Sequence, residues 1–290
     1  MSGFSTGVNA VRTAAQLIDM AGDNIANANT PGYHLKRADI SPVIGPTIGG
    51  IRIGLGSRVD DIQRVRNELI ERALLQHVQA KELFATEQET LEHLELLFGE
   101  PSDAGLDARL GEFFDSVEML AADPDDTTLR EQVLQKADAV CQMFNRLDTG
   151  VQQVLDDLWN KIDYTVGRIN ALSERIAALN GQIRDIETGG TTAASLKDTR
   201  DGLVSELAEL INITTYEVGD GVVNVSCAGT VLVNENHYLT IEAEPTDEGV
   251  VIQAEGAVGH RMRVRQGQLG GLLELYNQIV PDYAARLDEL

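Results

Sequence analysis

Histidines and cysteines, which often carry acid–base, nucleophilic or metal chemistry, are few in this sequence, and they are widely spaced. None of the histidines has a metal-ligand spacing such as HExxH, and no GxSxG nucleophile motif is present. We therefore expect no enzyme, no catalytic residue, no cofactor and no bound metal. The five histidines are His34, His77, His93, His237 and His260.

Two further groups of side chains could suggest metal or thiol chemistry. Asp123, Asp125 and Asp126 lie close together, but they lack the spacing and the distal Glu of an EF-hand calcium loop. We interpret them as the polar entrance of a helix, where a carboxylate can cap free N–H groups. Cys141 and Cys227 lie 86 residues apart and form no CxxC motif, so we expect small, buried, apolar roles for both.

The densest polar pattern is the stretch DNIANANTPGYHLKR, residues 23–37, in which Asn24, Asn27 and Asn29 follow one another closely. An amide both donates and accepts hydrogen bonds, so a row of amides suits contacts with the backbone of a neighbouring chain. Asn29 can close a helix in the left-handed conformation, and a proline commonly follows such a stop. Pro31-Gly32 suits the centre of a type II turn.

A short amphipathic helix is predicted directly before this stretch. Its apolar and small residues are spaced alternately by four and three, which places them in one narrow heptad stripe. A lone helix of this length is barely stable in water, so the stripe needs a partner. We call this stripe the seam and predict that it mediates assembly rather than packing within one monomer. It consists of Phe4, Val8, Val11, Ala15, Ile18, Gly22 and Ile25.

Composition excludes several classes of function. The 290 residues carry a formal charge of −23, which disfavours binding to nucleic acids or to anionic membranes. No stretch approaches the roughly 20 apolar residues of a membrane span, and no secretory signal is visible. On composition alone the protein would be assigned to the cytoplasm. The charge is uneven, because residues 1–60 hold five basic and four acidic residues and the remainder holds 18 and 42.

The remaining pattern predicts an α+β fold that is predominantly α. A second seam from Leu134 to Ile186 predicts a long helix at about 131–187, and the period changes to two beyond residue 212. We expect an assembly helix and join over 1–35, an extended Gly-rich arm over 36–61 and a helical bundle over 62–211. A small antiparallel β domain over 212–262 and a returning helical segment over 263–290 complete the prediction.

The stretch ANANTPGY, residues 26–33, resembles the Ala-Asn-x-x-Thr-Pro-Gly-Tyr signature of bacterial flagellar axial proteins. Further stretches, among them RNELIERALLQ, DTRDGLVSELAELINI and GQLGGLLELYNQIV, are similar to the flagellar hook-associated protein 1 family. The matching family motif is Asn24, Ala26, Asn27, Asn29, Thr30, Pro31, Gly32 and Tyr33. Rod and hook proteins share only the first 40 or so residues of this pattern.

The resemblance implies a structural subunit that forms a ring joining the hook to the filament and takes part in flagellum assembly. Its implied partners are copies of itself, the hook protein, the next hook-associated protein and the flagellar type III export apparatus. It implies an extracellular location, reached without a cleaved signal peptide. Family members are nearly twice as long, so the resemblance also implies that the C-terminal part is lacking here. The alternatives are another axial subunit, of the hook or distal rod, and a cytoplasmic coiled-coil scaffold.

Overall fold

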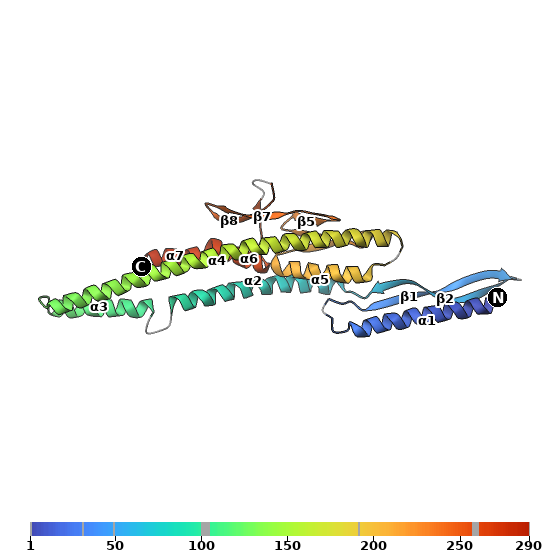
Figure 1. Ribbon diagram of the computed structural model, residues 1–290, viewed down its shortest axis with the longest axis horizontal. Helices are drawn as coiled ribbons and strands as arrows, with labels where there is room; N and C mark the ends of the chain where they lie inside the picture. Colours follow the sequence, from blue (N-terminus) through green and yellow to red (C-terminus); the bar gives the residue numbers. More distant parts are fainter. Residues whose placement is uncertain are drawn as a thin grey trace. The chain divides into compact units, whose positions relative to one another are not determined.

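A computed structural model describes residues 2–30, 32–48, 50–99, 105–190, 192–256 and 261–289. These residues form two compact units. The first unit comprises Met1–His77, Asn170–Ala208 and Ile213–Thr240, and the second comprises Val78–Ile169, Glu209–Asn212 and Ile241–Leu290. Long helices and small antiparallel sheets make up both units (Figure 1), which confirms the predicted α+β class with mainly helical content.

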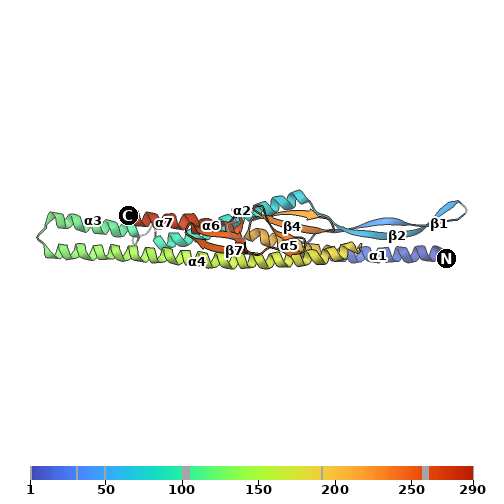
Figure 2. The same cartoon turned by 90° about the horizontal axis from the view of Figure 1, so that it is seen from above.

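The first unit begins with helix α1 (Ser2–Ala26), followed by strands β1 (Lys36–Ile48) and β2 (Ile51–Arg64). The two strands pair antiparallel, from Lys36 opposite Arg64 to Ile48 opposite Ile51, and their register shifts at three points. The segment predicted as an extended arm is therefore a long hairpin. Helix α1 lies along this hairpin in both views (Figures 1 and 2).

The rest of the first unit packs helices against a four-stranded sheet. It contains the start of α2 (Glu68–Phe98), the end of α4 (Thr127–Thr188) and α5 (Ala194–Leu210). The sheet has the order β3 (Thr214–Val218), β4 (Val222–Cys227), β5 (Thr230–Asn234) and β6 (His237–Tyr238). Its core contains Ile176, Ile183, Leu207, Val225 and Leu232, each at most 1% exposed.

The second unit contains the rest of α2 and α4 together with α3 (Leu106–Ala122). A three-stranded sheet follows, formed by β7 (Ile241–Thr246), β8 (Gly249–Ala254) and β9 (Arg261–Met262). The last elements are α6 (Gly267–Glu274), a π-helical turn η1 (Leu275–Ile279) and α7 (Val280–Glu289). Core positions include Leu94, Leu158, Ile162, Leu272 and Leu275.

Asp126 begins α4 as the sequence predicts. Its Oδ1 accepts hydrogen bonds from the backbone N–H groups of Thr128 at 2.7 Å and Leu129 at 3.3 Å. These bonds lower the pKa of the Asp126 carboxyl. The acidic stretch is therefore a helix entrance, in which one carboxylate satisfies N–H groups that the helix leaves free.

The long seam of α4 departs from expectation at its two ends. Val151, Leu158 and Ile176 are buried, but Leu134 is 70% exposed and Cys141 is exposed. In a straight α-helix, a stripe with a seven-residue repeat rotates about the helix axis by about 20° per heptad. The ends of a long stripe therefore turn away from the surface against which its middle packs. The prediction that Cys141 is buried is therefore wrong. Cys227 is fully buried, and burial raises the pKa of its thiol to about 12.

The compact units also divide the chain differently from the predicted domains. The strands of residues 212–262 form two sheets, β3–β6 in the first unit and β7–β9 in the second. The helical range 62–211 is likewise shared between the two units. Local alternation predicts strands, whereas the choice of packing partner depends on residues that are distant in sequence. His260 and Leu290, the last residue of the predicted returning segment, lie outside the described residues.

Candidate functional site

The polar face of α1 is the face that contacts the hairpin. Asn9 donates from Nδ2 to the carbonyl oxygen of Leu55 at 2.9 Å, and Thr13 Oγ1 donates to that of Ser57 at 2.8 Å. Thr13 is 5% exposed. Gly56, between these carbonyls, has a φ of +93°, and a Cβ there would lie 3.1 Å from the Thr6 carbonyl oxygen. Helix and hairpin are thus held by short polar side chains across a close approach of backbones.

The predicted seam lies on the other side of α1. At about 100° of rotation per residue, the seam positions centre opposite Asn9 and Thr13. Phe4 is 81% exposed and Ile25 is 78% exposed, and every other seam position is also exposed. The seam residues therefore form a continuous apolar stripe that the first unit leaves uncovered.

The C-terminal end of α1 is joined to the start of β1 by a compact hydrogen-bond cluster. Asn24 donates from Nδ2 to the Lys36 carbonyl oxygen at 2.9 Å and accepts from the Lys36 N–H at 2.9 Å. The Tyr33 hydroxyl also donates to Asn24 Oδ1, at 2.9 Å. Lys36 Nζ lies 2.6 Å from Asp23 Oδ2, and this hydrogen bond lowers the pKa of the Asp23 carboxyl. We call Asp23, Asn24, Tyr33 and Lys36 the join.

The turn at residues 30–33, between the helix end and β1, has the hydrogen bond and the positive φ that the sequence predicts. The Tyr33 N–H donates to the Thr30 carbonyl oxygen at 3.2 Å, and Gly32 has a φ of +77°. A positive φ at the third residue is typical of a type II turn. Pro31, the second residue, lies outside the described residues.

The amides of the motif are used differently from the prediction. Asn24 bonds the backbone of its own chain, and Asn27 donates to the carbonyl oxygen and side chain of Asp23. Ala26 and Asn29 are exposed. The helix ends at Ala26 rather than at Asn29. Asn24 turns inward because the reversal at residues 30–33 returns the backbone of Lys36 to the helix end, within its reach.

The open end of the hairpin, where β1 begins and β2 ends, is fixed to α5 by charged side chains. Arg64 lies 2.9 Å from Asp198 and 2.8 Å from Asp201, and its side chain is 5% exposed. Arg200, which is fully buried, contacts Asp201 at 2.9 Å and donates to the Gly221 carbonyl oxygen at 2.5 Å. We call Arg64, Asp198, Arg200 and Asp201 the root cluster.

The root cluster is not predicted by the sequence. Asp198 and Asp201 lie 134 and 137 residues from Arg64, a separation that no local pattern spans. The charged run KDTRD contains three residues of the root cluster, but such a run is equally typical of a helix face exposed to solvent.

His34 lies between the join and the root cluster. Its ring nitrogens are 3.2 Å from a Glu71 oxygen and 3.2 Å from an Asp198 oxygen. Arg66 pairs with the same Glu71 at 2.5 Å. Burial raises the pKa of the Glu71 carboxyl, but the hydrogen bond and charge of Arg66 outweigh burial, so the pKa is lowered. Among the histidines in the described part of the chain, His34 is the one that the structure places against carboxylates.

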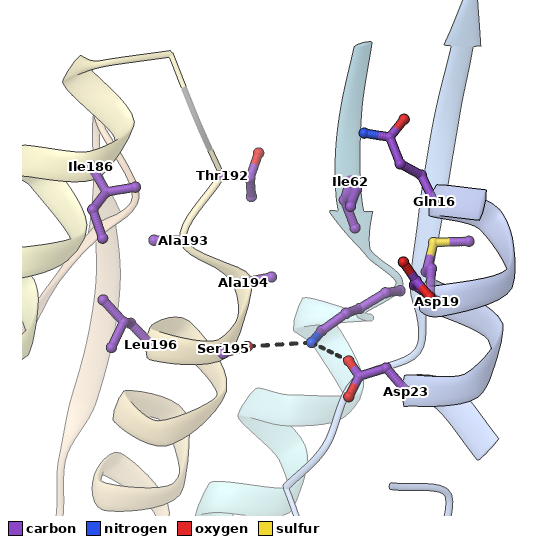
Figure 3. A pocket seen from close by; sticks show the side chains of 12 residues that line it. Gln16, Asp19, Asp23, Ile62, Ile186, Thr192, Ala193, Ala194, Ser195 and Leu196 are labelled. Atoms are coloured by element: carbon purple, nitrogen blue, oxygen red, sulfur yellow. Dashed lines mark hydrogen bonds and ion pairs between the residues drawn. The ribbon is translucent and has the colours of Figure 1, made fainter. Parts of the chain in front are cut away.

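A cleft of about 500 Å³ separates the join from the segment between α4 and α5 (Figure 3). Lys36 spans it from Asp23 to Ser195, whose Oγ lies 3.4 Å from Nζ. Thr192 donates to Asp61 at the opposite wall. Figure 3 shows small and apolar side chains on both sides of the cleft. Ile186, Ala193, Ala194 and Leu196 lie on the α4–α5 side, and Ile62 lies on the hairpin side.

The arrangement is suited to holding elements together. The carboxylates of the join and the root cluster lie against lysine or arginine side chains. In the described part of the chain, no group of three or more His, Cys, Asp or Glu side chains is arranged to hold a metal ion. Nor does any described helix combine the length and apolar character needed to cross a membrane.

Comparison with known proteins identifies relatives of both ends of the chain. A family model described as the flagellar hook-associated protein FlgK helical domain matches residues 91–290. A second model, described as flagella basal body rod protein, matches residues 4–34 and so covers the seam and the whole motif.

Curated relatives are flagellar hook-associated proteins 1. The chain is 26% identical over 239 residues to that of Bacillus subtilis, covering 79% of this chain and 47% of the relative. It is 27% identical over 285 residues to that of Salmonella typhimurium, covering 94% and 51%. The chain thus spans about half the length of these relatives.

A solved structure shares the fold. The flagellar hook junction protein FlgK from Burkholderia pseudomallei superimposes with a TM-score of 0.63 at 20% sequence identity. The match covers 74% of this chain and 40% of that protein.

Proposed function

The chain belongs to the family of the flagellar hook-associated protein FlgK, and we propose on this basis that it is a structural subunit of the junction between flagellar hook and filament. The family is a structural one, and the proposed role involves no catalysis. The proposed partners are further copies of the chain, the hook protein, the next hook-associated protein and the flagellar type III export apparatus. The proposed location is extracellular, in the flagellum.

The observation that supports this role best is the exposed seam of α1. Five large apolar side chains, Phe4, Val8, Val11, Ile18 and Ile25, are 41–81% exposed on one helix face, while the opposite polar face holds the hairpin. An exposed apolar stripe of this kind marks an interaction surface. Its heptad spacing suits packing against another helix.

The join and the root cluster supply the second part of the role. The join fixes the end of α1 to the start of β1, and the root cluster fixes the end of β2 to α5. We propose that together they set the angle at which α1 and the hairpin leave the α4–α5 part of the first unit. A fixed angle would let identical subunits present the seam in the same direction around a ring.

The test is immunogold electron microscopy of the producing cells, using an antibody to the α4 helix. Cells carry the unaltered chain, Ile18→Asp or the control Ala10→Asp. Ala10 is also exposed on α1 but lies off the seam. We expect a thin band of gold between hook and filament for the unaltered chain and for Ala10→Asp, and no band for Ile18→Asp, because a buried carboxylate is costly in an apolar contact.

Three results would change the proposal. An unaltered band in Ile18→Asp cells would show that the seam is not an assembly element. Gold along the whole hook would assign the chain to the hook instead. Gold confined to the cytoplasm, with none on flagella, would contradict the proposed location.

A further inference from the structure

A second exposed apolar surface lies in the second unit, between α2 and α7. It is a groove of about 580 Å³, and Phe98 of α2 contacts Tyr283 of α7 across it with ring centroids 5.9 Å apart. We call it the α2–α7 groove. It is lined by Phe84, Glu87, Gln88, Leu91, Glu92, Leu94, Glu95, Phe98 and Tyr283.

The floor of the α2–α7 groove is an apolar stripe with helical spacing. Phe84, Leu91 and Phe98 follow one another at intervals of seven residues, so they lie on one face of α2 over about 21 Å. Phe84 is 63% exposed and Leu91 is 36% exposed, and Tyr283 adds a ring that is 39% exposed. A long, shallow apolar stripe of these dimensions fits the apolar face of a helix.

The rim of the groove carries charge of one sign. Glu87, Glu92 and Glu95 line it, and no lining residue is a lysine or arginine. Burial raises the pKa of the Glu87 carboxyl, and the negative charge of Glu274 raises it further. A cation at this rim would relieve the repulsion between these carboxylates.

We propose that the α2–α7 groove binds an amphipathic helix of another protein, one that presents leucine or aromatic residues to the floor and lysine or arginine to the rim. A second copy of this chain fits poorly, because the chain carries a charge of −23. The seam helix is also no match for the rim, since it contains Arg12 together with Asp19 and Asp23. This surface is separate from the seam and does not depend on the function proposed above.

The test uses a fluorescein-labelled synthetic helix of about 18 residues, long enough to cover the stripe, with leucines on one face and lysines elsewhere. Its binding to the full chain is followed by fluorescence anisotropy at about 0.15 M salt. We expect saturable binding that Phe84→Ser weakens by about tenfold or more, as for a central interface residue. Leu96→Ser is the matched control, because Leu96 is 80% exposed on the same helix but does not line the groove.

The charged rim is tested with a triple variant, Glu87→Gln, Glu92→Gln and Glu95→Gln. It should weaken binding and reduce its salt dependence, whereas Glu118→Gln, Glu131→Gln and Asp138→Asn, which lie at exposed positions outside the groove, should leave binding within about twofold. A second probe with glutamates in place of the lysines should not bind.

Several outcomes would overturn the inference. Absence of saturable binding would remove the site, and equal losses for Phe84→Ser and Leu96→Ser would show that the floor is not used. Equal losses for the two triple variants would show only general attraction to an acidic chain. Binding of the glutamate probe with similar affinity would contradict the charge complementarity.

Discussion

Asp201 on α5 lies between two guanidinium groups, those of Arg64 and Arg200. Its side chain is 18% exposed, and burial alone would raise its pKa. The charges of Arg200 and Arg64 outweigh burial, so the pKa of the Asp201 carboxyl is lowered. One carboxylate therefore neutralises a buried arginine and fixes the end of the hairpin.

The lowered pKa predicts how stability changes with pH. A carboxyl whose pKa is lower in the folded than in the unfolded state stabilises the fold above its unfolded pKa. That contribution is lost as the pH falls below about 4 and through the lower folded-state value. We expect Asp201→Asn to cost about 3 kcal/mol at pH 7, since it leaves Arg200 buried without its partner.

Urea unfolding followed by circular dichroism checks this expectation. The stability difference between the unaltered chain and Asp201→Asn should be constant near neutral pH and should shrink in acid. Asp247→Asn, at an exposed turn position, is the control and should follow the unaltered chain at each pH. A stability difference that grows on acidification would contradict the assigned sign.

At the scale of elements, α1 presents two faces with different roles. Its polar face bonds strand carbonyls through Asn9 and Thr13, and its apolar face remains exposed. The hairpin thus supports the helix without covering the seam. This division explains how a short amphipathic helix can be held in place while its apolar side chains remain available to a partner.

A substitution at Gly56 tests whether the hairpin holds α1 in place. An alanine there would have to adopt a φ near +93° and would bring its Cβ to 3.1 Å from the Thr6 carbonyl oxygen. We expect Gly56→Ala to weaken the docking of α1 by about 1.4 kcal/mol, which corresponds to about tenfold faster amide exchange in the helix. Gly54→Ala is the control, because a Cβ at Gly54 meets nothing within 4 Å. Hydrogen–deuterium exchange measures this difference. Unchanged amide exchange of α1 in Gly56→Ala would contradict the claim that the hairpin holds the helix.

At the scale of the whole molecule, the excess negative charge and the seam lie in different parts of the sequence. Residues 1–60 are nearly neutral, while the rest of the chain holds 18 basic and 42 acidic residues. The acidic part favours solubility and opposes close approach of copies, whereas the near-neutral part carries the seam, the proposed assembly surface. Self-association through the proposed surface would therefore be a balance between an apolar seam and repulsion between the acidic parts.

This balance predicts that salt promotes self-association at neutral pH. Raising sodium chloride from about 0.02 to 0.5 M shortens the screening length several-fold and weakens the repulsion between copies. Sedimentation velocity should show a larger weight-average sedimentation coefficient at high salt for the unaltered chain and for Ala10→Asp. Ile18→Asp should show little change. An equal increase in Ile18→Asp would mean that association uses a surface other than the seam.

Features that depend on neighbouring residues could be predicted from the amino-acid sequence alone. The heptad spacing from Phe4 to Ile25 predicted the helix, and Pro31-Gly32 predicted the turn whose hydrogen bond joins residues 30 and 33. The change of period after residue 212 predicted the strands. Periodicity and turn chemistry act over a few residues, so they can be read from the chain itself.

The tertiary structure, in contrast, determines which distant groups meet. It turned Asn24 inward onto Lys36, brought Arg64 to Asp198 and Asp201, and left Cys141 exposed. It also divided the strands between two sheets and created the α2–α7 groove from segments almost 200 residues apart. Ion pairs and packing faces depend on the positions of whole elements, and a helix or a charged run has the same local pattern whichever partner it finds.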